Sequence, residues 1–335
     1  TETEAHLIHG FEGRARAFVE IQQGCDHRCT FCVIPFARGP NRSVGLGRIV
    51  EQVRTLVDRG FREVVLTGVD ICSFGVDLPG KPKLGDLVKR LLAAVPALPR
   101  LRLSSLDPAA IDDGLFDLLA TEPRLMPHLH LSIQSLDDVI LKRMKRRHLY
   151  RDVNRVITRA RAARPDVVFG ADLIAGFPTE TDAQFKNTLS SINALDITHL
   201  HVFPYSERPG TPAVRMPLVC VTERKARAQR LREAGTQALG RFMANQVGDI
   251  ATVLIERDGL GLSEHYAPVR IDVDTVAGQI MPVAFVGLKV VMRVRVRQWG
   301  HKLPRASWAA VTITRTIPGD SCEHNHTPVS VTAML

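Results

Sequence analysis

Three closely spaced cysteines stand near the start of the chain. Cys25, Cys29 and Cys32 are separated by three and then two residues in the stretch GCDHRCTFC. Three thiolates on so short a loop can ligate three irons of a cubane four-iron cluster, whereas a cluster that only transfers electrons takes four cysteines. The fourth iron then stays open to the amino and carboxylate groups of S-adenosylmethionine, whose reductive cleavage needs such an iron. Zinc is the alternative, with His27 as its fourth ligand, although a ring inside the loop is poorly placed to reach the metal.

The residues around the cysteines extend this pattern. FVEIQQ (18–23) precedes them, VIPFARG (33–39) follows them, and LTGVDI (66–71) comes after the first helical segment. Together they resemble the radical S-adenosylmethionine (SAM) enzymes, and within these the methylthiotransferases that act on threonylcarbamoyladenosine beside the anticodon of transfer RNA. The resemblance implies one 4Fe-4S cluster held by three cysteines, SAM, a tRNA anticodon loop as substrate, and an electron donor such as a flavodoxin or ferredoxin. Isopentenyladenosine in tRNA and an aspartate of a ribosomal protein remain open as substrates.

The remaining cysteines do not suggest a second centre. Cys72, Cys220 and Cys322 are scattered, which predicts ordinary thiols rather than a disulfide framework. The methylthiotransferases carry a further domain before the radical SAM region, with three cysteines for an auxiliary 4Fe-4S cluster, and nothing in these residues corresponds to it. We therefore expect the chain as given to cleave SAM without completing methylthiolation. An iron-sulfur RNA-binding protein without turnover is the alternative from another class.

Length, composition and charge indicate the number of domains and the kind of partner. The 335 residues, 45% hydrophobic and 24% charged, predict one large globular domain followed by a small one. The chain has no apolar run of eighteen residues, and its start, TETE, is unlike a signal peptide, so a cytoplasmic monomer without a membrane segment is expected. A net charge of +9 favours a polyanionic partner.

The first two thirds of the chain predict an α/β fold. Six segments rich in Val, Ile and Leu alternate with helix-period segments, at 17–21, 63–67, 100–104, 128–133, 167–174 and 198–203. This alternation predicts a partial (βα)6 TIM-like barrel over 13–246, with an exit helix over 222–247 and a linker or remnant over 1–12. In such barrels the functional residues gather at the carboxyl ends of the strands.

Polar residues and glycines follow the predicted strands. By resemblance, Thr67, Gly68, Val69 and Asp70 bind the cofactor's amino group, Ser104, Ser132 and Gln134 its ribose or carboxylate, and Ile174, Gly176 and Pro178 its adenine, with Asp172 in the same set. Each also has a structural interpretation: Gly68 as a turn glycine, Ser104 as a helix N-cap, Asp172 as a cap at a strand end. The basic run 142–147 is expected near the barrel mouth, where Arg146 or Arg147 can bind phosphate or the cofactor carboxylate, or simply face solvent.

The last part of the chain predicts strands without helices. Residues 247–316 resemble the TRAM domain, a small antiparallel β-barrel that ends these enzymes. Because strand side chains alternate, Arg293, Arg295 and Arg297 share one face, which suits RNA phosphates. A charged solvent face is the alternative. Residues 317–335 are expected to be disordered.

Overall fold

The structure is a computed structural model that describes residues 15–289 and 331–334. All six predicted barrel strands form, and each lies within two residues of its expected bounds. They are β1 (Arg16–Gln23), β3 (Glu63–Gly68), β4 (Arg100–Leu103), β5 (His128–Gln134), β6 (Val168–Ala175) and β7 (His199–Pro204). The predicted strand that carries Arg293, Arg295 and Arg297 lies outside the described residues.

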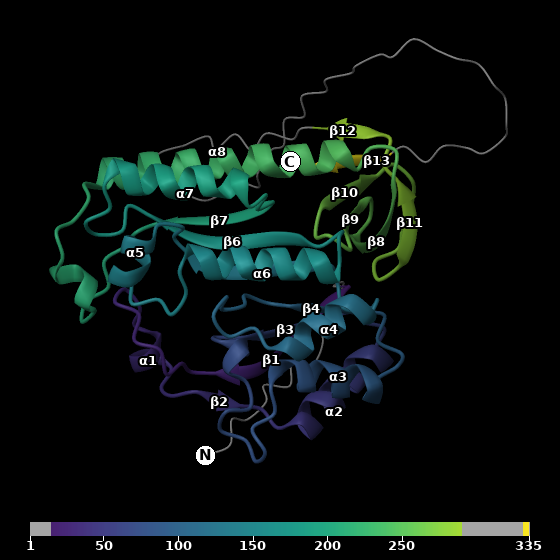
Figure 1. Cartoon of the computed structure of the whole chain (residues 1–335). Helices are drawn as coiled ribbons and strands as arrows, with labels where there is room; N and C mark the ends of the chain where they lie inside the picture. The colour runs from purple at the N-terminus through teal and green to yellow at the C-terminus, as the bar shows by residue number, and fades with distance from the viewer. Residues whose placement is uncertain (1–14, 290–330, 335) are drawn as a thin grey trace, which may run out of the picture.

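The barrel strands form two curved parallel sheets. The first has the order β2-β1-β3-β4, with the two-residue β2 (Arg42–Ser43) antiparallel at its edge, and the second has the order β5-β6-β7. Two isolated bridges, Leu101 with Leu125 and Leu106 with Leu131, connect the sheets. Within the described part of the chain no strand pairing joins β7 back to β1. The predicted partial barrel is therefore confirmed as an open, curved α/β structure (Figure 1).

The longer helices cover the outside of the barrel, and each buries one apolar face against it. The apolar stripe of α2 (Leu46–Asp58) is buried at Ile49, Val53 and Leu56, and α3 (Leu84–Ala94) buries its Leu and Val residues on one face. A capping box in which Thr181 pairs with Gln184 starts α7 (Asp182–Ala194). The helices of four or more residues are α1 (Ile34–Ala37), α2 (Leu46–Asp58), α3 (Leu84–Ala94), α4 (Asp113–Thr121), α5 (Asp138–Arg143), α6 (Tyr150–Ala163), α7 (Asp182–Ala194) and α8 (Val221–Asn245). Among the described residues no helix combines the length and apolarity that a bilayer crossing requires.

The chain ends in a separate small sheet. Its order is β11-β8-β9-β10-β13-β12, and all neighbours are antiparallel except β12 and β13. The strands are β8 (Ile250–Arg257), β9 (Leu260–Ser263), β10 (Pro268–Ile271), β11 (Ile280–Ala284), β12 (Gly287–Lys289) and β13 (Val331–Met334). Strand β13 lies in the tail that the sequence predicts to be disordered, and it pairs with β10, so that prediction is wrong for these four residues.

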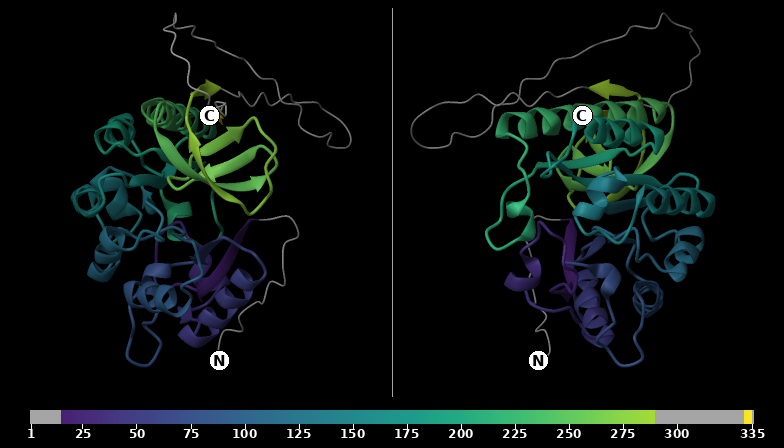
Figure 2. Two further views of the ribbon diagram at one scale, coloured as in Figure 1. Left: turned by 90° about the vertical axis from the view of Figure 1, so that its right-hand side faces the viewer. Right: turned by 60° about the vertical axis from the view of Figure 1, so that its left-hand side comes forward.

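The small sheet packs against the amino ends of the barrel strands. Arg16 in β1 bonds Glu256 at 2.6 Å, Arg100 in β4 donates to the carbonyl of Thr252 at 2.7 Å, and His199 in β7 contacts the carbonyl of His265 at 3.1 Å. The cysteine loop follows the opposite, carboxyl end of β1. The small sheet and the cysteine loop therefore lie at opposite ends of the barrel (Figures 1 and 2).

Candidate radical SAM site

The three cysteines lie on the loop between β1 and α1, at the carboxyl end of the barrel strands. Gly24 opens this loop with φ +69°, and a Cβ there would lie 1.9 Å from the carbonyl oxygen of Pro40. The amide of Cys25 donates to the carbonyl of Gly39 at 3.1 Å, which closes the loop on itself. Cys25, Cys29 and Cys32 are all unpaired and partly exposed. Three free thiols on one closed loop fit a cluster with one open iron.

The electrostatics of these thiols also suit a cationic ligand. Burial raises the pKa of Cys25 to about 11 and also raises the pKa of Cys32, so without a metal both are neutral at pH 7. A bound iron would supply the positive charge that makes the thiolates stable. The guanidinium of Arg146 donates to Cys29 Sγ at 3.6 Å and adds a cation on the same side.

The zinc alternative loses support from the position of His27. Its Nε2 lies 2.8 Å from the carboxylate of Asp70. His27 and Asp70 come within 4.8 Å of Cys25, but the group that they form includes neither Cys29 nor Cys32. A structural zinc site takes four nitrogen or sulfur ligands, and this arrangement does not gather them.

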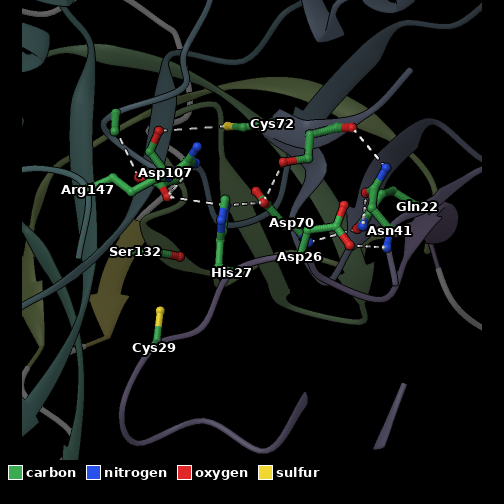
Figure 3. Close-up of polar contacts among 12 residues, drawn as sticks. Gln22, Asp26, His27, Cys29, Asn41, Asp70, Cys72, Asp107, Ser132 and Arg147 are labelled. Carbon is green, nitrogen blue, oxygen red and sulfur yellow. Dashed lines mark hydrogen bonds and ion pairs between the residues drawn. The ribbon is translucent and has the colours of Figure 1, made fainter. Parts of the chain in front are cut away.

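A network of polar side chains joins the cysteine loop to the strand ends (Figure 3). Asp70, one of the predicted cofactor residues, holds His27, and its amide donates to Gln22 Oε1 at 2.7 Å. Asp107 lies on the other side of His27, 4.0 Å away. Figure 3 shows His27 between the two carboxylates. The network therefore fixes the loop against the ends of β3 and β4.

Asp107 contacts two arginines and a histidine of the loop after α5. Its carboxylate lies 3.5 Å from Arg146, 3.1 Å from Arg147 and 3.5 Å from His148 Nδ1. Burial alone would raise the pKa of Asp107, but the hydrogen bond with His148 and the charge of Arg146 lower it well below the usual range. Asp107 stays ionised and orients Arg146 toward Cys29. The sequence places Asp107 after the third predicted strand but does not indicate this role.

Several predicted cofactor residues lie around this network. Thr67 and Gly68 end β3, and a Cβ on Gly68 would come within 2.9 Å of Gln22, which explains the glycine. Val69 is exposed beside them. Ser104 Oγ is buried without a hydrogen-bond partner, so it is available to a ligand. The carbonyl of Ser132 accepts from Arg146 at 2.8 Å.

A cavity of about 440 Å³ adjoins the cysteine loop. Its lining residues are Phe31, Gln134, Asp172, Ile174, Phe203, Pro204, Tyr205, Ser206 and Arg208. Three of the predicted cofactor residues, Gln134, Asp172 and Ile174, are among them. Gly176 and Pro178 are buried instead and do not line the cavity. Gly176 faces Arg224 of α8, where a Cβ would lie 2.6 Å from the Arg224 side chain, so close packing accounts for this glycine.

Two histidines that the sequence analysis did not single out hold Asp172. His130 Nε2 lies 3.1 Å and His201 Nδ1 lies 3.4 Å from the same carboxylate oxygen, while Ser105 donates to the other oxygen at 3.1 Å. Both histidines belong to His-Leu-His patterns in β5 and β7. Alternate strand residues share a face, so this pattern is the signal that could have found them. They keep the Asp172 carboxylate in place at the edge of the cavity.

Cys72 is half-buried next to the network, in the 3-10 turn Ile71–Ser73. Its Sγ is 3.9 Å from the carbonyl of Asp107 (Figure 3), and burial strongly raises its pKa. A half-buried neutral thiol with one carbonyl partner fits the prediction of an ordinary cysteine.

Comparison with known proteins agrees with this geometry. Residues 19–192 match the model of the radical SAM superfamily, and the chain belongs to that superfamily. Membership implies a 4Fe-4S cluster and SAM as its cofactors, which Cys25, Cys29 and Cys32 fit. Coproporphyrinogen III oxidase from Escherichia coli, described as a radical SAM enzyme, has a similar fold, with a TM-score of 0.50 and 15% identity over 82% of this chain and 69% of its own.

Within the superfamily the chain belongs to the methylthiotransferases. It is 51% identical to the threonylcarbamoyladenosine tRNA methylthiotransferase MtaB of Rickettsia prowazekii, over 86% of this chain and 68% of that protein. It is 37% identical to a tRNA-2-methylthio-N(6)-dimethylallyladenosine synthase of Roseobacter denitrificans, over 82% of this chain and 64% of the relative. The chain thus spans about two thirds of the length of these relatives.

Proposed function

We propose that this chain carries the radical SAM part of a tRNA methylthiotransferase that acts at C2 of threonylcarbamoyladenosine next to the anticodon. The observation that carries the proposal is the loop of three free cysteines at the strand ends, joined to a cavity that Asp172 and Ile174 line. The higher identity to the threonylcarbamoyladenosine enzyme, 51% against 37% for the dimethylallyladenosine enzyme, supports the choice of nucleoside.

The residues divide the work as follows in this proposal. Cys25, Cys29 and Cys32 hold the cluster, which with SAM supplies a reductively generated deoxyadenosyl radical. The residues at the ends of β3 to β5, namely Thr67, Gly68, Val69, Asp70, Ser104, Ser132 and Gln134, bind the amino acid part and ribose of SAM. Asp172, oriented by its two histidines, accepts hydrogen bonds from ligand hydroxyl groups in the cavity, and Ile174 contacts an adenine ring. SAM and the substrate, once both are bound in the cavity, keep water away from a reactive species.

The partners follow from the same proposal. The substrate is the anticodon loop of a tRNA, the reductant is a flavodoxin or ferredoxin, and the site of action is the cytoplasm. Residues 247–316 form a TRAM-like RNA-binding unit, with Arg293, Arg295 and Arg297 as phosphate ligands. Reversing two of these arginines to glutamate is expected to weaken tRNA binding and to lower its salt dependence by about one log-log unit for each lost contact.

The test measures cofactor cleavage and its dependence on tRNA. Reconstituted under anaerobic conditions and reduced, the chain is expected to convert SAM to methionine and 5′-deoxyadenosine. A tRNA with threonylcarbamoyladenosine should stimulate this cleavage more than a tRNA with isopentenyladenosine, and mass spectrometry of both RNAs tests for a methylthio product. Stimulation by the isopentenyladenosine tRNA alone would contradict the choice of nucleoside. A chain that binds iron but releases no deoxyadenosine would refute the catalytic proposal.

A further inference from the structure

Positive charge is concentrated around the mouth of the barrel, the end where the strands reach the cysteine loop. The three segments 24–48, 142–147 and 203–219 contain eleven Lys or Arg and two acidic residues. The whole chain has 44 basic and 35 acidic residues, so the net charge of these three segments equals the net charge of the whole chain, +9. Residues 250–287 of the small sheet contain two basic and five acidic residues. Among the described residues, therefore, the mouth is electropositive and the small sheet is not.

Direct hydrogen bonds hold the three segments together. Thr30, in the cysteine loop, donates from its amide to the carbonyl of Met144 at 3.0 Å and from its hydroxyl to the carbonyl of Arg143 at 2.8 Å. Its own carbonyl accepts from the amide of Ala213 at 2.9 Å. Figure 1 shows α1 and α5 on the same side of the barrel, away from β8 to β11. The basic residues thus belong to one surface that surrounds the candidate site.

Six cations of this surface are exposed and form what we call the basic rim. They are Arg28, Arg38, Lys142, Lys145, Arg208 and Arg215. None of the six has an ion pair with any described residue. On the outer helices of the barrel Arg155 pairs with Asp152, whereas Arg59, Lys89 and Arg90 are exposed without an ion pair to any described residue, so the position of the rim cations and not their lack of partners sets them apart. A solvated face normally intersperses both signs of charge, whereas the rim presents one sign around a concave site.

An exposed aromatic side chain accompanies this charge. Phe36 in α1 is 73% exposed, and the guanidinium of Arg28 lies 5.7 Å from the centre of its ring. Phe36 also borders a groove of about 440 Å³, with Val33, Ala37, Pro209 and Gly210 as the other lining residues. Aromatic side chains next to arginines are typical stacking platforms for unpaired bases.

We propose that the basic rim binds the phosphates of the substrate RNA around the anticodon loop, and that Phe36 stacks on an unpaired base next to the target nucleoside. This inference rests on the proposed function, because it takes tRNA as the substrate. Charge complementarity selects RNA as the occupant of the groove: a polyanion with unpaired bases matches both the unpaired cations and the exposed ring. While the target nucleoside enters the cavity, the neighbouring nucleotides stay outside it, bound by the basic rim and Phe36.

The experiment compares two variants with the same change in charge. The rim variant is Arg38→Glu with Lys142→Glu and Arg215→Glu, one residue from each segment. The control variant is Arg59→Glu with Lys89→Glu and Arg90→Glu, which are exposed at the end of α2 and on α3, on the outside of the barrel. Binding of a threonylcarbamoyladenosine-containing tRNA is measured against salt concentration. Cluster iron and tRNA-independent cleavage of SAM are measured for both variants, and they are expected to stay unchanged.

The rim variant is expected to bind tRNA about tenfold or more weakly at about 0.1 M salt, with a log-log salt slope smaller by about two units. The control variant should bind like the unsubstituted chain. Equal weakening of both variants would overturn the proposal, because only net charge would then matter, and unchanged binding by the rim variant would overturn it as well. If the unsubstituted chain cleaves SAM but binds no tRNA, the proposed substrate itself is refuted.

Phe36→Ala tests the stacking separately. It is expected to lower tRNA affinity about fivefold or more while it leaves the salt slope unchanged, because stacking on a base releases no counterions. A changed salt slope, or unchanged affinity, would show that no base stacks on Phe36. Unchanged affinity would also indicate that the groove beside Phe36 binds a protein segment and not RNA.

Discussion

Replacing Asp107 with asparagine removes one buried negative charge that several cations share. Asp107 is 6% exposed, and its two most buried partners, Arg146 and His148, lie 3.5 Å away. Removing one member of a buried ion pair costs about 3 to 5 kcal/mol, because the remaining charge stays buried without a partner. Arg147 is 47% exposed, so its share is small. The amide oxygen of asparagine can still accept from the amide of Ala109, which favours the lower figure, about 3 kcal/mol.

Two measurements follow from this change. The free energy of unfolding in urea at pH 7 should fall by about 3 kcal/mol. Iron bound after anaerobic reconstitution should also fall, because Asp107 orients the Arg146 guanidinium that donates to Cys29. The pKa of Asp107 is lowered in the folded chain, so its stabilising effect is present above the unfolded pKa of about 4 and is lost as the pH falls through the lower, folded pKa. The difference in the free energy of unfolding between the unsubstituted chain and Asp107→Asn should therefore become smaller at acidic pH.

A surface pair provides the control. Asp196 is 73% exposed and lies 3.4 Å from Arg161, so Asp196→Asn should change stability by less than about 0.5 kcal/mol. If Asp107→Asn changes stability as little as this control and leaves the iron content unchanged, the role assigned to the network is wrong.

Three further predictions concern the cysteine loop and the amino end of the barrel strands. Cys29→Ala should abolish the iron-sulfur absorption after reconstitution, whereas Cys72→Ala should retain it; loss of the cluster in Cys72→Ala would mean that Cys72 is a ligand. Gly24→Ala should destabilise the chain by about 1 to 3 kcal/mol and reduce cluster assembly, because the new Cβ meets Pro40 at a positive φ; normal assembly would contradict the close approach. Burial lowers the pKa of His199 to about 4, so the unfolded chain takes up a proton below about pH 6.5 while the folded chain does not. His199 should therefore lower the free energy of unfolding by about 2 kcal/mol between pH 7 and pH 5. His199→Gln should remove this contribution, which urea titrations of both proteins at pH 7 and pH 5 measure.

Local pattern was sufficient to predict much of this protein. The six barrel strands and helices α2, α3 and α8 appear where hydrophobic period and residue type indicate them, because neighbouring residues along a strand or helix determine which face is buried. The cysteine loop is equally local, since three thiols within eight residues can converge in few ways. The sequence alone thus determined the barrel and the place of the cysteine loop at the carboxyl end of its first strand.

Contacts between distant residues were decided by the tertiary structure. Arg146 reaches Cys29 across 117 positions, and His130 and His201 meet at Asp172 only because β5, β6 and β7 are neighbours in register. The pairing of β13 with β10 and the attachment of the small sheet to the amino end of the barrel likewise lie beyond any local pattern. Covalent geometry restricts residues a few positions apart, whereas residues this far apart meet only through the order and curvature of the sheets, which the packing of the whole core determines.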